Sequence, residues 1–216
     1  MIPLRPTRHA TRFPLVTVAL VVVNVLAFIW ELGVDEAAIV AFAVVPSNLI
    51  RGEGWLTPLT SMFLHSGLMH IAGNMLFLCV FAPAIEDAMG RGRFLSFYLM
   101  GGLAAAAAQV AAAPASTVPM VGASGAIAAV MGAFLVTYPG ERIRVLWFFG
   151  VFAKVSEVPA FLLVGVWLLT QMMNQVGAVV DADAGGVAYA AHVGGAVFGM
   201  LTARLFETPA APAVAQ

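Results

Sequence analysis

Apolar residues occur in long continuous runs along this chain, and only short polar stretches interrupt them. Six of the runs approach about 20 residues, the length that an α-helix needs to cross the hydrocarbon core of a bilayer. The fourth run is short and rich in small residues, so its helix would have to be buried inside a bundle. We predict an all-α fold, a polytopic six-transmembrane-helix bundle. The spans are expected near residues 13–31, 66–85, 94–112, 122–138, 159–176 and 187–206.

Composition strengthens the prediction of a membrane protein. Of the 216 residues, 62% are hydrophobic and 10% are charged, whereas soluble domains carry roughly 25% charged residues. The net charge of −1 provides no basic field for nucleic acid. The single cysteine, Cys79, excludes an intramolecular disulfide and a cysteine zinc cluster. We expect no cofactor, no metal and no nucleic-acid partner.

The first apolar run could imitate a secretory signal, because three arginines precede it. The run from Phe13 to Trp30 is long for a signal peptide, however, and no small-x-small cleavage site follows it. We interpret it as a retained signal anchor. The expected organisation is a cytoplasmic N-terminal segment, a six-helix domain and a disordered cytoplasmic tail, at residues 1–12, 13–206 and 207–216.

The basic residues predict the orientation of the spans. With a cytoplasmic N-terminus, nine of the ten Lys and Arg residues fall on the cytoplasmic side, and Arg51 alone falls on the other. This asymmetry is the positive-inside signal of membrane topology. The C-terminus then returns to the cytoplasm. The composition, rich in Ala, Val, Gly and Arg, indicates a bacterium, and the expected location is the bacterial inner (plasma) membrane. The nine residues are Arg5, Arg8, Arg12, Arg91, Arg93, Arg142, Arg144, Lys154 and Arg204.

The loop from Gly33 to about Leu64 is long for a membrane protein. It contains an apolar run, Ala37–Val45, that is too short to span. Further on lies Trp55, a residue type that is enriched at the level of the lipid headgroups. We expect interfacial or partly embedded elements here, with a plain surface loop as the alternative.

Polar residues deep in the spans are the candidates for chemistry, because such residues are costly in a bilayer and usually face the protein interior. His70 and Asn74 are four apart and share one face of the second span. Ser124 lies at the head of the fourth span, and His192 lies three residues before Gly195, where a close-packing GxxxG pattern begins. At about 1.5 Å per residue from the non-cytoplasmic side, these polar sites lie at matching depth.

Ser124 and His192 would form a nucleophile and a general base, a pair that can attack a carbonyl and form an acyl-enzyme. All acidic residues lie at span ends or in loops, so the sequence predicts a Ser–His dyad without a third, acidic member. His70, Asn74 and the N–H of Ser124 could donate hydrogen bonds to the oxyanion. Taken alone, His70 and Asn74 could instead hydrogen-bond neighbouring helices, and His192 could be a structural histidine.

These residues resemble the motifs of the rhomboid intramembrane serine proteases. The match comprises His70-x-x-x-Asn74, Gly122-Ala123-Ser124-Gly125 and Ala191-His192-x-x-Gly195-x-x-x-Gly199, in the second, fourth and sixth spans. Order, spacing and helix number agree over roughly residues 12–206, in the minimal six-span bacterial form. The resemblance implies that Ser124 is the nucleophile and His192 the base. It also implies that His70, Asn74 and Gly122 form the oxyanion and substrate-binding site.

The resemblance further implies that the protein hydrolyses peptide bonds in or near transmembrane segments of other membrane proteins, with single-span proteins as substrates inside the lipid bilayer. It gives His65 a structural role, and it implies that Glu86 ties down the cytoplasmic end of the second span, where the residues alone indicate a solvated end-loop. Two positions depart from the family pattern. Leu56 stands where the family often has arginine, and Ala128 stands where an aromatic residue often lies beneath the catalytic histidine.

The fifth span, near 159–176, contains bulky residues and no small-residue motif. We expect a lipid-facing, loosely packed helix. Together with the loop 177–186, it is the candidate gate for lateral access of substrate and for water.

Three alternatives can be weighed against a protease. An inactive relative that binds other proteins would lack Ser124 or His192, and both are present. A small transporter or channel would show more intramembrane acids and an inverted internal repeat. A metal site made of three histidines is disfavoured by the five-residue spacing of His65 and His70 and by the lack of a cysteine or acid beside them.

Overall fold

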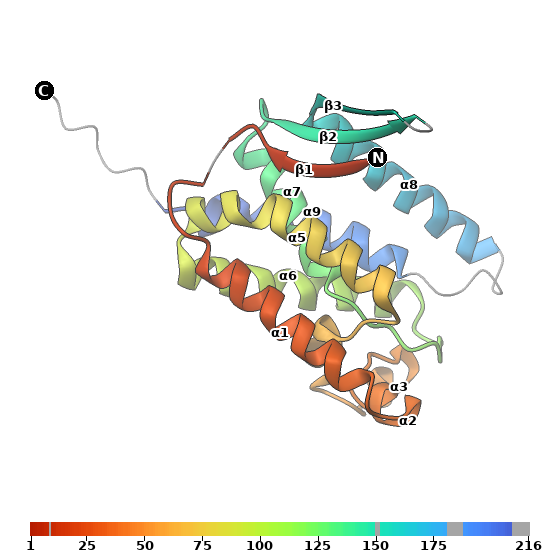
Figure 1. The fold of residues 1–216 in the computed structure, drawn as a ribbon. Helices are drawn as coiled ribbons and strands as arrows, with labels where there is room; N and C mark the ends of the chain where they lie inside the picture. The colour runs from red at the N-terminus through yellow and green to blue at the C-terminus, as the bar shows by residue number, and fades with distance from the viewer. Residues whose placement is uncertain (9, 150–151, 181–187, 209–216) are drawn as a thin grey trace, which may run out of the picture.

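Helices form most of the molecule, and a three-stranded sheet covers one end of the helical bundle (Figure 1). The computed structural model describes residues 1–8, 10–149, 152–180 and 188–208 of the chain. The elements in chain order are β1 (Ile2–Pro6), α1 (Leu15–Glu31), α2 (Glu36–Val40), α3 (Pro46–Ile50), α4 (Thr57–Thr60), the 3-10 turn η1 (Ser61–Phe63), α5 (Leu68–Met89), α6 (Arg91–Ala112), α7 (Ser124–Thr137), β2 (Arg142–Phe149), β3 (Phe152–Pro159), α8 (Ala160–Val180) and α9 (Tyr189–Phe206).

Two described helices, α5 and α6, are long and apolar enough to cross a membrane by length and composition. Helices α1 and α7 and residues 160–175 of α8 are apolar but shorter. The 14 residues of α7 extend only about 21 Å at 1.5 Å per residue, less than a bilayer core of roughly 30 Å. The count of six spans therefore stays a prediction. Residues 181–186 of the expected gate loop and 209–216 of the expected tail lie outside the described residues.

The sheet corrects the prediction of an all-α fold. Strands β2 and β3 form an antiparallel hairpin, and β1 pairs with β2 to give the order β1-β2-β3. Along β2, Ile143 and Val145 are fully buried, whereas Arg142 and Arg144 lie on the other face and pair with Glu157. This alternation with a period of two is the signal of a half-buried strand. The helix-length apolar runs on both sides of it had concealed the signal.

Helix α7 occupies the interior of the bundle, where it packs against α5, α6 and α9. Every residue from Gly125 to Phe134 is buried. Small residues allow this close approach: a Cβ atom at Gly125 would lie 2.5 Å from Cβ of Ala105 in α6, and one at Gly132 would overlap the carbonyl of Ala196 in α9. The prediction that the short fourth helix is buried inside the bundle is confirmed.

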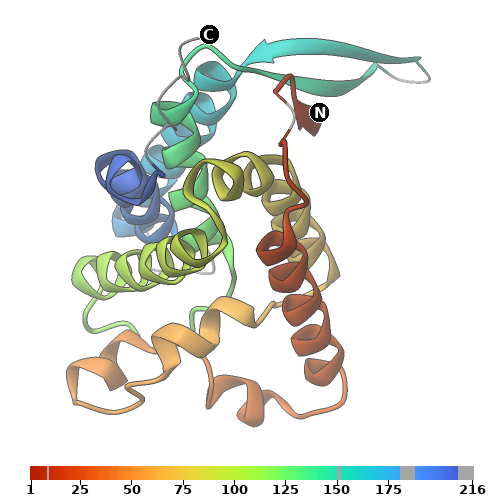
Figure 2. The same cartoon turned by 90° about the vertical axis from the view of Figure 1, so that its left-hand side faces the viewer.

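The long loop after α1 folds into short helices that cross the end of the bundle opposite the sheet (Figure 2). Val44 and Met120 exchange two backbone hydrogen bonds, of 3.1 and 2.7 Å, and the Gly122 N–H donates to the Ser61 carbonyl at 2.9 Å. These backbone hydrogen bonds hold the loop in place. An arginine is not needed at the position of Leu56, which is exposed. The loop thereby fixes the chain just ahead of Ser124, while its depth in a membrane stays a prediction.

Glu86 fastens α5 to the start of α1, as the resemblance implied, and it does not lie in a solvated end-loop. Its buried carboxylate accepts hydrogen bonds from the N–H groups of Val16 and Thr17 and from the Thr17 hydroxyl, at 2.8–2.9 Å. The N–H groups of a first helical turn have no intrahelical partner, and the helix dipole favours an anion there. Glu86 therefore satisfies the N-terminus of α1 from inside the bundle.

Candidate active site

Ser124 is the first residue of α7, at the end of the bundle away from the sheet. A helix N-terminus offers N–H groups without intrahelical partners and the positive end of the helix dipole. Just ahead of it, Gly122 has a φ of +129°, a backbone conformation that favours glycine. The chain therefore turns sharply into α7 and leaves the serine at the head of a buried helix.

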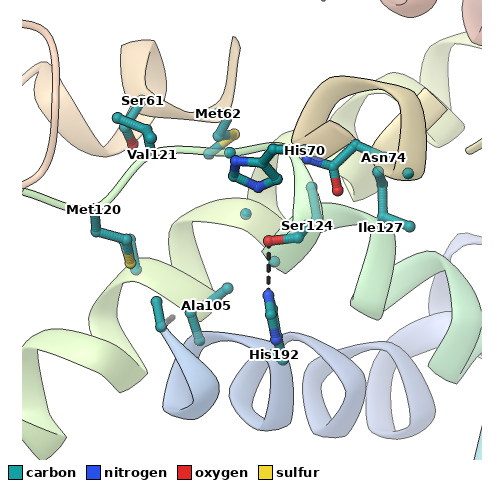
Figure 3. A pocket seen from close by; sticks show the side chains of 18 of the residues that line it. Ser61, Met62, His70, Asn74, Ala105, Met120, Val121, Ser124, Ile127 and His192 are labelled. Carbon is teal, nitrogen blue, oxygen red and sulfur yellow. Dashed lines mark hydrogen bonds between the residues drawn. The ribbon is translucent and has the colours of Figure 1, made fainter. Parts of the chain in front are cut away.

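His192 lies in the first turn of α9 and faces Ser124 (Figure 3). Its Nε2 atom is 2.7 Å from Oγ of Ser124. The distance is set by direct backbone contact between the helices, because a Cβ atom at Gly199 would overlap the carbonyl oxygen of Ala129. The predicted close-packing face of the sixth span is confirmed, and the structure shows that its partner is α7.

Helix α8 supplies two contacts to His192 that the sequence analysis did not foresee. Oε1 of Gln171 is 2.7 Å from Nδ1 of the His192 ring. One turn earlier, the indole of Trp167 packs on the ring, with centroids 5.5 Å apart and planes inclined by 39°. Trp167 thus takes the place of the aromatic residue that is missing at Ala128. The available signal was one of three amides in a bulky apolar helix, the one that comes four residues after a tryptophan. Helix α8 is therefore not purely lipid-facing.

Helix α6 holds the start of α9 from its other side. Oε1 of Gln109 accepts a hydrogen bond from the Ala191 N–H at 3.2 Å. The first N–H groups of a helix need such an external partner. Gln109 is therefore a satisfied polar contact, and it fixes the residue next to His192.

His70 presents a hydrogen-bond donor to the space beside Ser124 (Figure 3). Its Nδ1 accepts from the Ser66 N–H at 3.3 Å and lies 3.0 Å from the Ser66 hydroxyl. Because a backbone N–H can only donate, Nδ1 is unprotonated, and the proton of the neutral ring is on Nε2. That Nε2 lies against Gly122, where it would be 2.9 Å from an added Cβ atom.

Asn74 lies one turn after His70 on the same face of α5. Its side chain is buried, and its Nδ2 finds no hydrogen-bond partner within the described part of the chain. The same Nδ2 would be 3.6 Å from a Cβ atom at Gly122, so it points toward the same place as His70. A buried donor without a partner costs about 1–3 kcal/mol. Such a donor is suited to a group that binds in the cavity.

A cavity of about 360 Å³ joins these residues. Ser124, His192, His70, Asn74 and Gly122 all line it, so the structure brings together every site residue that the sequence singled out. The rest of the wall is largely apolar, with Met62, Phe77, Met120, Ile127 and Met131 among its residues. The arrangement combines a hydroxyl, an imidazole and two further donors in one apolar recess, a set that can perform acyl transfer.

His65 supports His70 from behind. Its N–H donates to the Glu31 carboxylate, 3.0 Å from each oxygen, and its ring meets the His70 ring edge to face with centroids 5.1 Å apart. Burial, and secondarily the nearby His70, lowers the pKa of His65 to about 4. The ring is therefore neutral at neutral pH, which agrees with a structural role.

Known proteins are similar to this chain over the stretch that contains these residues. Residues 52–208 match the Rhomboid domain. Rhomboid protease GluP of Bacillus subtilis (strain 168) is 38% identical over 101 residues, which are 47% of this chain and 19% of that protein. Putative rhomboid protease YdcA of the same organism is 32% identical over 124 residues, 57% of this chain and 62% of that protein. The human mitochondrial presenilin-associated rhomboid-like protein is 27% identical over 192 residues, 84% and 45% of the two chains.

The chain spans less than two thirds of the length of each of these relatives. The domain match nevertheless covers well over half of this chain. It includes all five residues that line the cavity as candidates for chemistry. The chain therefore belongs to the rhomboid family of integral membrane proteins.

Proposed function

We propose that this protein is a serine endopeptidase that hydrolyses peptide bonds in or near the transmembrane segments of other membrane proteins. The observation that carries the proposal is the 2.7 Å contact between Ser124 Oγ and His192 Nε2 at the wall of a cavity. The names of two similar bacterial proteins, one a rhomboid protease and the other a putative rhomboid protease, support it. In this proposal Ser124 is the nucleophile and His192 is the general base.

The first half of the reaction forms an acyl-enzyme. Ser124 Oγ attacks the carbonyl carbon of the scissile peptide while its proton passes to Nε2 of His192. The tetrahedral intermediate then expels the amine of the leaving segment, which takes the proton from Nε2. One C–N bond is broken, one C–O ester bond is formed, and His192 is neutral again.

The oxyanion of the intermediate would form beside Gly122. Nε2–H of His70 and the Nδ2 of Asn74, which has no partner among the described residues, both face this place. The N-terminal N–H groups of α7 add a positive dipole end at the same point. Donors already aimed at the developing charge lower the barrier without reorganisation, and each is typically worth about 10²–10³ in kcat.

Water completes the second half of the reaction. A water molecule attacks the ester carbonyl and gives its proton to Nε2 of His192, and collapse of the second intermediate returns that proton to Ser124 Oγ. The carboxylate product then leaves. The cavity lies at the end of the bundle away from the sheet, and water would reach it from that side.

Single-span membrane proteins would be the substrates, entering from the bilayer. An intact helix keeps its carbonyls in hydrogen bonds, so the segment must unwind before Ser124 can attack. Helix α8 packs mainly on α9 and carries an exposed apolar row on its outer side, which suits a lateral gate. The exposed residues include Phe161, Leu162, Val166, Leu169 and Met173.

The proposed topology has six spans in residues 13–206, with both termini and the sheet on the cytoplasmic side of a bacterial inner membrane. Contacts at one end of the bundle support it: Thr208 N–H donates to the Ala88 carbonyl, and Thr11 N–H donates to Asp87. The strands that carry Arg5, Arg142 and Arg144 lie at this same end. The cavity would then face the non-cytoplasmic side.

The test compares four purified proteins on a single-span test substrate in detergent and in liposomes: wild type, Ser124→Ala, His192→Ala and the control Ser96→Ala. Ser96 is exposed on α6, and among the described residues its hydroxyl bonds only the Gly92 carbonyl of its own helix. We expect cleavage by wild type and Ser96→Ala and none by the other two, while all four unfold at similar temperatures.

Two results would overturn the proposal. Continued cleavage by Ser124→Ala would remove the nucleophile assignment. A wild-type protein that neither cleaves nor reacts at Ser124 with a fluorophosphonate would remove the protease activity itself, because this probe needs only an activated serine and no particular peptide.

A further inference from the structure

Both ring nitrogens of His192 have a hydrogen-bond partner: Nε2 contacts Ser124, and Nδ1 contacts Gln171 on α8. We propose that Gln171 is a positioning residue for the base: it accepts the hydrogen bond of Nδ1–H and so keeps Nε2 free to receive the serine proton. This inference rests on the proposed function, since it assigns the base of the same reaction. It adds a third, uncharged member to what the sequence predicted as a dyad.

Proton accounting on the ring supports the assignment. A neutral imidazole carries one proton on one nitrogen. The Ser124 hydroxyl lies 2.7 Å from Nε2, and it can donate there only if Nε2 is bare. The proton is then on Nδ1, and Gln171 Oε1 lies 2.7 Å from Nδ1 and can accept its hydrogen bond. The amide oxygen therefore selects the tautomer in which His192 can act as a base.

The orientation of the Gln171 amide follows from its neighbours on α8. Its Nε2 lies 3.4 Å from the Thr170 hydroxyl oxygen. That hydroxyl donates its own hydrogen bond to the Trp167 carbonyl at 2.6 Å, so toward the amide it can act only as an acceptor. The amide nitrogen is thereby drawn toward Thr170, and the oxygen is the atom left for His192.

An amide suits this place better than the carboxylate that orients histidine in many serine hydrolases. A carboxylate inside a bilayer is costly unless it is paired. An amide oxygen costs far less to bury, and it still accepts a stronger, charge-assisted bond when His192 takes up the serine proton. The carbonyl of Gln171 thus stabilises the imidazolium in the transition state without a resident charge.

The position of α8 becomes part of the catalytic geometry through these contacts. Gln171 and Trp167 are four residues apart and so lie on one face of the helix, and both touch the His192 ring. An outward movement of α8 would withdraw the acceptor and the packing partner together. The base is therefore oriented when α8 is docked on α9.

The test uses one matched set of variants of the full chain. Gln171→Met keeps the length of the side chain and removes the acceptor, whereas Gln171→Glu keeps an oxygen at the same place. Asn174→Met makes the same amide-to-thioether change at an exposed position of α8, one turn further on. The first readout is the rate at which a fluorophosphonate labels Ser124 in detergent, and the second is the ¹⁵N NMR spectrum of labelled histidine, with His192→Ala to assign the signals.

We expect wild type to show His192 protonated at Nδ1, and Gln171→Met to show a mixture of tautomers. Loss of a hydrogen bond to the developing imidazolium should slow labelling about 10- to 100-fold. Gln171→Glu should restore the wild-type tautomer and a rate within about threefold, because its oxygen can still accept. Asn174→Met should match wild type in both readouts.

An unchanged tautomer and an unchanged labelling rate in Gln171→Met would overturn the positioning role. Equal losses in Gln171→Met and Gln171→Glu would also overturn it, since they would indicate disturbed packing of α8. If wild-type Ser124 does not react with the probe at all, the proposed protease activity fails. The NMR comparison of wild type and Gln171→Met then decides the positioning role by itself.

Discussion

Gly195 in α9 lies directly against the carbonyl oxygen of Gly125 in α7, so that a Cβ atom at position 195 would overlap that oxygen. Each glycine is a near neighbour of a site residue: Gly125 follows Ser124, and Gly195 comes three residues after His192. The contact between the two glycines therefore fixes the separation of the two helices at the level of the site. The hydrogen bond from Ser124 to His192 depends on it.

Gly195→Ala should separate α7 from α9 and break the site. The obstacle is backbone, which cannot rotate away, so the helices must move apart. Such overpacking costs about 1–3 kcal/mol of unfolding free energy. A displacement of about 1 Å at the reacting groups typically lowers the rate about 100-fold. Thermal unfolding in detergent and fluorophosphonate labelling of Ser124 would measure the two effects.

Gly165→Ala is the matched control for this prediction. Gly165 lies in α8, and a Cβ atom there would have no described atom within 4 Å. Alanine also has the higher helix propensity, so this variant should keep its labelling rate and gain up to about 1 kcal/mol of stability. A Gly195→Ala protein that labelled as fast as Gly165→Ala would show that the glycine contact does not set the site geometry.

Asn74→Leu should separate function from stability. The Nδ2 of Asn74 is buried without a partner in the described part of the chain, so an apolar side chain of similar size removes an uncompensated donor. We expect an unfolding temperature equal to or above that of wild type. We also expect a kcat about 10²-fold lower with little change in KM, because an oxyanion donor acts only in the transition state.

Steady-state kinetics on the single-span substrate would check this prediction beside a denaturation curve. A variant that lost stability and kept kcat would reverse both expectations. Asn74 would then be a residue that holds helices together, the alternative that the sequence left open.

Much of the site could be predicted from the sequence because its residues are exceptions to their surroundings. His70, Asn74, Ser124 and His192 are polar residues in apolar spans, and counting from the span ends gave them a common depth. The glycines after His192 predicted a close contact between helices, and the structure shows that the partner of α9 is α7. Depth and helix face are properties of single helices, so periodicity alone is enough to find them.

The sheet and the role of α8 could not be found in this way. Strand β1 pairs with β2 across more than 130 residues of chain, and no local pattern records such a partner. From the sequence, Gln171 is one amide in a helix expected to face lipid. Its role depends on a contact with His192 in the next helix, which the pattern of α8 does not record. Its partner was visible only once α8 and α9 were placed side by side.

Glu86→Ala should weaken the bundle at the end opposite the cavity. It would leave the N–H groups of Val16 and Thr17 without their acceptor inside the protein. Loss of an N-terminal cap and of buried charge-assisted bonds costs about 2 kcal/mol or more. For a chain of this size that corresponds to a fall of about 5 °C in Tm.

Asp87→Ala is the comparison for this prediction. Asp87 accepts bonds from Thr11 at an exposed place, so its loss should cost less than about 1 kcal/mol. The folded fraction of Glu86→Ala should label at Ser124 at the wild-type rate. Equal Tm values for the Glu86 and Asp87 variants would contradict the view that the hydrogen bonds of Glu86 anchor the N-terminus of α1 to α5.

Acidification should destabilise the protein partly through His65. Burial lowers the pKa of His65 in the folded protein to about 4, whereas an unfolded histidine titrates near pH 6.5. Between these values the unfolded chain binds one more proton than the folded chain. Stability due to this group is therefore fully present above about pH 6.5 and falls as pH decreases toward 4, by up to about 1.4 kcal/mol per pH unit.

His65→Phe isolates this contribution, because phenylalanine keeps a ring against His70 and the backbone N–H that Glu31 accepts. Both ring nitrogens of His65 lack partners within the described residues, so the change removes no hydrogen bond of the side chain. Denaturation curves of wild type and variant between pH 7 and pH 4 would give the two slopes. We expect the slope of His65→Phe to be smaller by about one proton, and parallel slopes would mean that His65 is protonated equally in the folded and unfolded chains.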